Sequence, residues 1–278
     1  MNGTMVIGRE TGPVVVLDAA GVIGRGLLAA ALEAGHAVVA VDRTPAALAG
    51  LAAEHPHQRL STLTGSATGQ DDARALAARL ARLGRPPLAV LAAVDASGLR
   101  GRLLDQPAEA TCAGLQAALA PQLNAVRHLL PLLRDGGQYV LVGGPGGVHP
   151  WAGHGQRSLV EAALRMLARI LHDEARASGV RLQLLSVATP TCGLHAGPPR
   201  PHWPSALQIG QRALRLLDEA PGEPVVDFAL APGHVLPAPA PIPEPEPAAA
   251  SADCLRDARV LLGRLAAALP LMHKEAHR

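Results

Sequence analysis

Aromatic residues are nearly absent from this chain. Phe, Trp and Tyr make up 1% of its 278 residues, as two tryptophans, one tyrosine and one phenylalanine. Proteins that bind single-stranded nucleic acid stack bases on aromatic side chains, and this composition supplies no such platform. The formal net charge of +2 creates no strong field toward nucleic acid or membrane either. We therefore expect neither partner, and we expect a core built from Ala, Leu and Val.

Lysine, cysteine and long hydrophobic runs are also scarce. Lys274 is the single lysine, so arginine carries almost all of the positive charge. The cysteines Cys112, Cys192 and Cys254 are far apart and form no C-x-x-C pair, which argues against a zinc site or a disulfide framework. No stretch approaches the ~18 uninterrupted apolar residues of a membrane helix, and the N-terminal residues do not resemble a signal peptide. These absences predict a cytoplasmic protein without a bound metal.

Strand and helix patterns alternate along most of the chain. Strands are expected at 14–17, 37–41, 59–63, 88–93, 138–142, 181–187 and 224–231, and helices at 24–34, 44–54, 71–83, 108–133, 158–177 and 204–219. The strands are near-continuous apolar runs, which is typical of a parallel sheet covered on both faces. The alternation implies right-handed crossovers. It predicts an α/β fold of the Rossmann type, with a doubly wound, parallel, seven-stranded sheet.

The composition changes after about residue 235. Proline occupies every second position from Pro237 to Pro247, which favours an extended polyproline segment. We therefore divide the chain into a Rossmann-like domain (1–235), a Pro-rich linker (236–250) and a C-terminal helical tail (251–278). The tail has one apolar seam, and it either folds back on its own domain or docks on a partner chain.

The most informative segment follows the first expected strand. Val14–Leu17 leads into Asp18-Ala19-Ala20-Gly21-Val22-Ile23-Gly24, which reads as a tight turn and the start of a helix. A strand, a glycine turn and a helix start are the layout of a dinucleotide-binding fold. One position departs from it, because Asp18 stands where the first glycine of the phosphate loop belongs.

From here the chain resembles the short-chain dehydrogenase/reductase family, over roughly residues 14–233. The family's loop reads T-G-x-x-G-x-x-G in its extended branch, so Gly21 and Gly24 match it. Asp42 matches the acid that binds the adenosine ribose in NAD-preferring members, and Arg43 leaves NADP open. The resemblance therefore implies a cofactor site at Gly21, Ile23, Gly24 and Asp42.

The family's catalytic positions are all substituted. Gly137–Gly144 looks like the family's G-x-I-V-x-x-S-S, which places the catalytic serine at Gly144. The Y-x-x-x-K motif falls on Arg157-Ser158-Leu159-Val160-Glu161, so Arg157 replaces the tyrosine and Glu161 the lysine. The family asparagine falls near Ala118, and the neighbouring Asn124 is out of place.

Hydride transfer in this family requires a tyrosine acid/base, a lysine that lowers its pKa and a serine that polarises the carbonyl. Arg157 cannot exchange a proton near neutral pH, because the pKa of arginine exceeds ~12. Gly144 has no hydroxyl, and Glu161 has the wrong charge. The resemblance therefore implies a degenerate, 3-oxoacyl-carrier-protein-reductase-like member. Arg157, Glu161 and Arg165 are four residues apart, which predicts an exposed ion-pair ladder on one helix.

Cofactor binding is a separate question, and two outcomes stay open: no cofactor, or NAD(P). A helix N-terminus favours anions, but Asp18 places a carboxylate close to where a pyrophosphate would bind. Gly21 and Gly24 also fit simple packing of a helix on a strand, and Asp42 also fits a turn at the end of a strand.

Other polar residues carry weaker signals. His149 and His154 lie in a loop that would flank the substrate, and Asp95 is a possible acid partner for either. Cys192 and His195 follow Pro190 in a second loop. Because His149 and His154 lack acid or cysteine neighbours at ligand spacing, we interpret them as solvated loop histidines. We interpret Cys192 and His195 as ordinary loop residues and not as a Cys–His dyad.

The leading hypothesis is that the chain is a catalytically inactive homologue that serves as the structural partner of an active ketoreductase or dehydrogenase in a biosynthetic pathway. We expect it to form a homo- or hetero-oligomer (dimer or tetramer) with a homologous short-chain dehydrogenase/reductase subunit. Fold and site are separable, so such a subunit is retained for its surface. One alternative is an NAD(P)-dependent oxidoreductase that acts on the ketone or alcohol of an acyl thioester with a non-standard acid/base set. Another is a nucleotide-sensing regulatory binder. Candidate assembly contacts are Ala117, Leu123, Val126, Leu130, Leu159, Ala163, Met166, Leu167 and Ile170.

Overall fold

Seven parallel strands form one sheet in the computed structural model, which describes residues 12–56, 58–94, 101–151, 153–191, 193–194 and 203–228. The strands are β1 (Val14–Leu17), β2 (Val38–Asp42), β3 (Leu60–Thr64), β4 (Ala89–Ala93), β5 (Gln138–Gly143), β6 (Arg181–Val187) and β7 (Val225–Phe228). Their order is β3-β2-β1-β4-β5-β6-β7, and each adjacent pair is parallel. The expected Rossmann-type, doubly wound, seven-stranded fold is confirmed.

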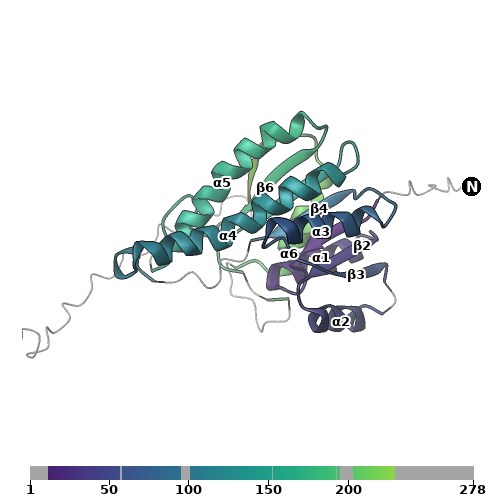
Figure 1. Cartoon of the computed structure of the whole chain (residues 1–278), viewed down its shortest axis with the longest axis horizontal. Helices are drawn as coiled ribbons and strands as arrows, with labels where there is room; N and C mark the ends of the chain where they lie inside the picture. The colour runs from purple at the N-terminus through teal and green to yellow at the C-terminus, as the bar shows by residue number, and fades with distance from the viewer. Residues whose placement is uncertain are drawn as a thin grey trace, which may run out of the picture. The chain divides into compact units, whose positions relative to one another are not determined.

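Helices cover both faces of this sheet because successive side chains of a buried strand point to opposite faces. The helices are α1 (Val22–Glu33), α2 (Pro45–Glu54), α3 (Gln70–Ala81), α4 (Ala108–Leu129), α5 (Gly155–Arg176) and α6 (Ala206–Asp218). One hydrophobic core joins the sheet to α3, α4 and α5, and a second joins its other face to α1, α2 and α6. Figure 1 shows α4 and α5 running side by side on the first face.

Most predicted boundaries agree with the structure to within two residues. The helix expected at 108–133 ends at Leu129 and continues as a short 3-10 helix, Leu130–Leu132. The helix expected at 158 begins at Gly155 instead. The linker 236–250, the tail 251–278 and the end of the last strand lie outside the described residues. No helix among the described residues is long and apolar enough to cross a membrane.

α1 and α6 pack against each other through glycine. A Cβ atom on Gly210 would lie 2.2 Å from the carbonyl oxygen of Gly26, and a Cβ on Gly26 would lie 2.1 Å from that of Ala206. Both distances are shorter than any side chain tolerates, so the approach depends on the two glycines. The contact fixes α1 against one face of the sheet, and the N-terminus of α1 lies close to the end of β1.

The strand order reverses at β1, which pairs with β2 on one side and β4 on the other. Crossovers leave in opposite directions at this point, so the loops after β1 and β4 separate and open a crevice at the carboxyl ends of the strands. Asp18 follows β1, Val94 follows β4 and Gly144 follows β5. Asp18 and Gly144, two positions at which the sequence departs from the family pattern, therefore lie at the same edge of the sheet.

Candidate functional site

Two cavities open along this edge. The β2-side cavity, of about 320 Å³, is lined by Leu17, Asp18, Val41, Asp42, Arg43, Gly65, Ser66, Ala67, Thr68, Leu76, Ala92, Ala93, Ala117, Ala118, Pro121, Gln122 and Ala125. The β5-side cavity, of about 480 Å³, is lined by Asp18, Gly21, Val22, Ile23, Gly24, Ala93, Val94, Val142, Gly143, Gly144, Pro145, Trp151, Arg157, Pro190 and Thr191. Asp18 and Ala93 line both. The predicted cofactor positions Gly21, Ile23 and Gly24 line one cavity, and Asp42 lines the other.

Asp42 organises the β2-side cavity from the end of β2. One carboxylate oxygen accepts a hydrogen bond from the Ala20 amide at 3.2 Å, and the other accepts one from the Thr44 amide at 2.9 Å. The residue is 6% exposed. Asp42 thus ties the loop after β1 to the loop after β2, as a strand-end turn residue does. Each oxygen keeps a second lone pair for a ligand hydroxyl.

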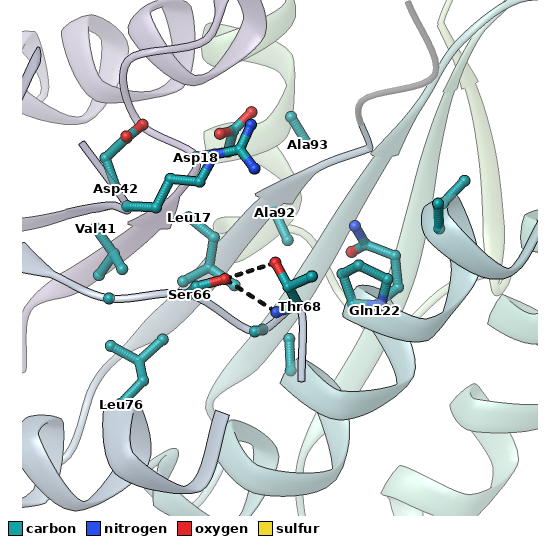
Figure 2. Close-up of a pocket in the computed structure, with 17 residues that line it drawn as sticks. Leu17, Asp18, Val41, Asp42, Ser66, Thr68, Leu76, Ala92, Ala93 and Gln122 are labelled. Carbon is teal, nitrogen blue, oxygen red and sulfur yellow. Dashed lines mark hydrogen bonds between the residues drawn. The ribbon is translucent and has the colours of Figure 1, made fainter. Parts of the chain in front are cut away.

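Gln122 is a site residue that sequence reasoning missed. It lies on α4, is 8% exposed and lines the β2-side cavity, and its Oε1 has no hydrogen-bond partner. Figure 2 shows Gln122 across the cavity from Asp42. The sequence did contain a signal for it: Gln122 is four residues after Ala118, so both lie on the same, buried face of the helix. The neighbouring Asn124 instead bonds the carbonyl groups of Ala67 and Thr68, so it holds a loop in place.

Asp18 adopts a left-handed backbone conformation, with φ at 51°. Few residues other than glycine adopt this conformation, although Asp is tolerated there. Its Oδ2 lies 2.9 Å from the position of a Cβ on Gly21, so the carboxylate stands beside the turn into α1. A Cβ on Gly24 would lie 2.0 Å from the Asp18 carbonyl oxygen. Gly24 is therefore required by helix–strand packing, whatever else it does.

Gly144, Arg157 and Glu161 share one small volume at the end of β5. A Cβ on Gly144 would lie 2.5 Å from Nη2 of Arg157 and 2.9 Å from Oε1 of Glu161. A Cβ on Gly143 would lie 2.7 Å from Oε2 of Glu161. The polar ends of Arg157 and Glu161 thus take up the space that a serine side chain would need.

The exposed ion-pair ladder predicted for α5 is wrong. The Glu161 side chain is 3% exposed and that of Arg157 is 22% exposed, with 4.0 Å between Nε of Arg157 and Oε1 of Glu161. Arg165 does not join them: it donates to Ser186 Oγ at 2.7 Å and to Asp227 Oδ1 at 2.8 Å. Spacing alone cannot distinguish a solvated face from a buried one, and the two glycines of β5 make room for the buried carboxylate.

Burial gives Glu161 an unusual protonation equilibrium. Desolvation raises its pKa from 4.5 to about 7, against the opposing effects of the Gly144 backbone amide and the Arg157 charge. Desolvation disfavours the charged form of a carboxyl group, so it outweighs both partners here. A carboxyl group with this pKa exchanges a proton near neutral pH, which the arginine cannot do.

The loop before α5 presents Trp151 to the β5-side cavity. The Trp151 and His154 rings stack with centroids 4.1 Å apart, and Cζ of Arg157 lies 5.2 Å from the Trp151 ring. Ser158 fixes the loop because its hydroxyl accepts from the Trp151 amide at 2.9 Å and donates to the His154 carbonyl. Ser158 therefore lies inside the first turn of α5, which begins at Gly155, three residues before the expected start.

The weaker candidates do not form a second site within the described residues. His149 is exposed and His154 is half-buried beside Trp151. Asp95, Cys192 and His195 lie outside the described residues. No group of three or more His, Cys, Asp or Glu side chains that could hold a metal ion occurs in the part of the chain that the structure describes.

Comparison with known proteins supports the fold. No protein-family model matches the sequence, and no curated protein matches it. A short-chain type dehydrogenase/reductase from Mycobacterium ulcerans superposes with a TM-score of 0.69 at 18% identity, covering 78% of this chain and 87% of its own. A short-chain dehydrogenase from Streptomyces avermitilis covers 96% and 98%, with a TM-score of 0.65 and 20% identity. A Pseudomonas aeruginosa short-chain oxidoreductase described as having an atypical catalytic center covers 78% and 95%, with a TM-score of 0.68 and 18% identity. The chain therefore has the fold of the short-chain dehydrogenases/reductases.

The nicotinamide dinucleotide implied by this fold does not fit all of the crevice. The β2-side cavity and Asp42 suit a ribose and its base. The region between the two cavities does not suit the pyrophosphate of the dinucleotide, because the Asp18 carboxylate lies beside the N-terminus of α1. That position is where a helix N-terminus would hold a pyrophosphate, and two negative groups there repel each other.

Proposed function

We propose that this chain is a degenerate short-chain dehydrogenase/reductase without dehydrogenase activity of its own, which assembles with a homologous, active subunit. One observation carries this proposal: Arg157 and Glu161 fill the space beside Gly144 where a serine hydroxyl would face a substrate carbonyl. No serine–tyrosine–lysine set stands at these three positions. The fold and its crevice are kept while the groups that move a proton to a carbonyl are replaced.

The outer surface of α4 and α5 supports a role in assembly. Leu123 on α4 and Leu159, Met166 and Ile170 on α5 are 41–54% exposed. Single exposed apolar residues are ordinary, but these four lie on two helices that pack against each other, and we call them together the α4/α5 face. Of the candidate contacts, Val126 does not belong to this face, because it is 5% exposed in the core.

Co-expression tests the proposal. The full chain is produced with a homologue that retains its serine, tyrosine and lysine, and the complex is measured by size-exclusion chromatography with light scattering. Ile170→Glu is expected to abolish the complex. Leu83→Glu is the matched control, because Leu83 is 47% exposed just after α3 and is not one of the four residues of the α4/α5 face. Recovery of the chain only as a monomer or a pure homo-oligomer would contradict the proposal.

A second candidate function is an oxidoreductase with a non-standard acid/base set. The pKa of about 7 at Glu161 favours it, since an ideal acid/base group titrates near the working pH. The purified chain alone is assayed with NAD(P)H and a ketoacyl thioester. Turnover that Glu161→Gln abolishes and the exposed-site variant Glu174→Gln leaves unchanged would establish this function and displace the first.

A further inference from the structure

The Arg157 guanidinium is fixed at the wall of the β5-side cavity. It lies between the Trp151 ring, 5.2 Å from Cζ, and the end of β5, where its Nη2 closely approaches Gly144. Stacking on an indole and contact with a strand end both restrict the guanidinium plane. The cavity therefore has a positive charge with a defined position and orientation.

That charge is incompletely paired inside the protein. Nε of Arg157 is buried and has no hydrogen-bond partner, and the same holds for Oε1 of Glu161. The two atoms are 4.0 Å apart, too far for a hydrogen bond. A charge without its full set of hydrogen bonds is costly, and the Arg157 side chain is 22% exposed at the cavity wall, so an anion that accepts hydrogen bonds from the accessible edge of the guanidinium is stabilised.

The rest of the cavity determines what such a ligand looks like. Flat or apolar side chains make up much of the wall, namely Val22, Ile23, Val94, Val142, Pro145, Trp151 and Pro190. Asp18 lines the end formed by the loop after β1. One carboxylate beside Arg157 is favoured, whereas a second negative charge or a phosphate dianion approaches Asp18 and is disfavoured.

We propose that the β5-side cavity binds an organic monocarboxylate with a flat apolar body, with its carboxylate on Arg157 and its body against Trp151. The volume of about 480 Å³ falls in the range of small-molecule sites. Binding would need neither a dinucleotide nor a partner subunit, so this inference stands apart from the proposed function.

The scarcity of tryptophan provides a direct probe. Trp151 and Trp203 are the two tryptophans of the chain, so Trp203→Phe leaves Trp151 as the single reporter. Benzoate is titrated into this variant while Trp151 fluorescence is recorded. A saturable change is expected with benzoate. Benzamide, a neutral molecule of the same shape, and phenyl phosphate, a dianion, are each expected to bind about tenfold or more weakly.

Three variants in the Trp203→Phe background test whether Arg157 supplies the positive charge that binds the carboxylate. Arg157→Gln is expected to weaken benzoate binding about tenfold or more. Arg169→Gln is the control, because Arg169 is an exposed arginine on the same helix, and it should leave binding unchanged. Glu161→Gln is expected to tighten benzoate binding severalfold at about pH 8, since it removes the competing carboxylate.

Two results would overturn the inference. The first is equal binding of benzoate and benzamide, which needs no folded Arg157 variant to interpret. The second is an Arg157→Gln protein with a native circular dichroism spectrum that binds benzoate as tightly as its parent. If Arg157→Gln does not fold, Arg157→Lys takes its place and should bind more weakly, because an ammonium group cannot form the paired contact.

Discussion

Gly144 is the residue whose replacement is most informative. A serine side chain placed there meets Nη2 of Arg157 at 2.5 Å and Oε1 of Glu161 at 2.9 Å. Both atoms are the ends of side chains that can shift, so we expect Gly144→Ser to lower the free energy of unfolding by only about 1 kcal/mol, the low end of the usual effect of overpacking. Denaturant unfolding measures it. Gly50→Ser is the control: a Cβ on this helical glycine meets nothing within 4 Å, so the variant should be as stable as its parent or slightly more so.

Glu161 makes stability depend on pH in an unusual direction. Its pKa is raised from 4.5 to about 7 in the folded protein, so between these values the folded chain holds a proton that the unfolded chain has lost. The stability contributed by the protonated carboxyl is complete below pH 4.5 and is lost as the pH rises through 7. The loss is on the order of 3 kcal/mol.

Glu161→Gln tests this dependence, because glutamine does not titrate. Between pH 4.5 and 7 the free energy of unfolding of this variant is expected to fall less steeply than that of the parent. Glu174→Gln, an exposed acid on the same helix, should reproduce the slope of the parent. Parallel curves for all three proteins would show that Glu161 titrates normally.

Among the elements, the loop from β1 into α1 decides whether phosphate can approach. Asp18 is strained at φ 51° and places a carboxylate beside the helix N-terminus. We expect Asp18→Gly to raise the affinity for ADP about tenfold or more, measured by calorimetric titration. Asp18→Asn separates charge from backbone strain and should recover most of the gain. Asp72→Asn, an exposed acid in the first turn of α3, should change nothing.

The contact between α1 and α6 makes a second prediction for the elements. Gly210→Ala places a methyl group 2.2 Å from the Gly26 carbonyl oxygen, so one helix must move. We expect a loss of ~1–3 kcal/mol or more in the free energy of unfolding, measured with denaturant. The same substitution at Gly50, which is also helical, should be neutral or stabilising. Equal stability of the two variants would contradict a tight glycine contact.

The positions of the strands could be predicted from the sequence because each strand is a short, continuous apolar run. A strand that is buried on both faces of a sheet requires such a run. The edge at which Gly21, Asp42 and Gly144 meet was predictable too, because parallel strands end at the same side of a sheet. The burial of Glu161 was not, since an acid four residues after an arginine is also the pattern of a solvated helix face. The two consecutive glycines that close β5 were the signal, but their consequence requires knowing which helix packs above them.

For the whole molecule, the proposed assembly assigns two roles to α5: its buried side chains contribute stability and its exposed ones contact the partner. Leu164 is fully buried against the sheet, whereas Met166 and Ile170 are about half exposed. We expect Leu164→Ala to cost ~2–5 kcal/mol in the free energy of unfolding. Met166→Ser and Ile170→Ser should cost under about 0.5 kcal/mol each, yet weaken the complex with a homologous subunit. Denaturant unfolding and sedimentation velocity measure the two effects, and a large loss of stability at Ile170 would contradict this division.

The shared volume of Gly144, Arg157 and Glu161 also bears on ancestry. Arg157 and Glu161 occupy the room that a serine at position 144 would need, so under the proposed function restoring the serine alone leaves a collision. If the chain descends from an active reductase, as the proposed function implies, the return to activity requires several simultaneous changes. On that proposal, a new role for the crevice is easier to reach than its former reaction.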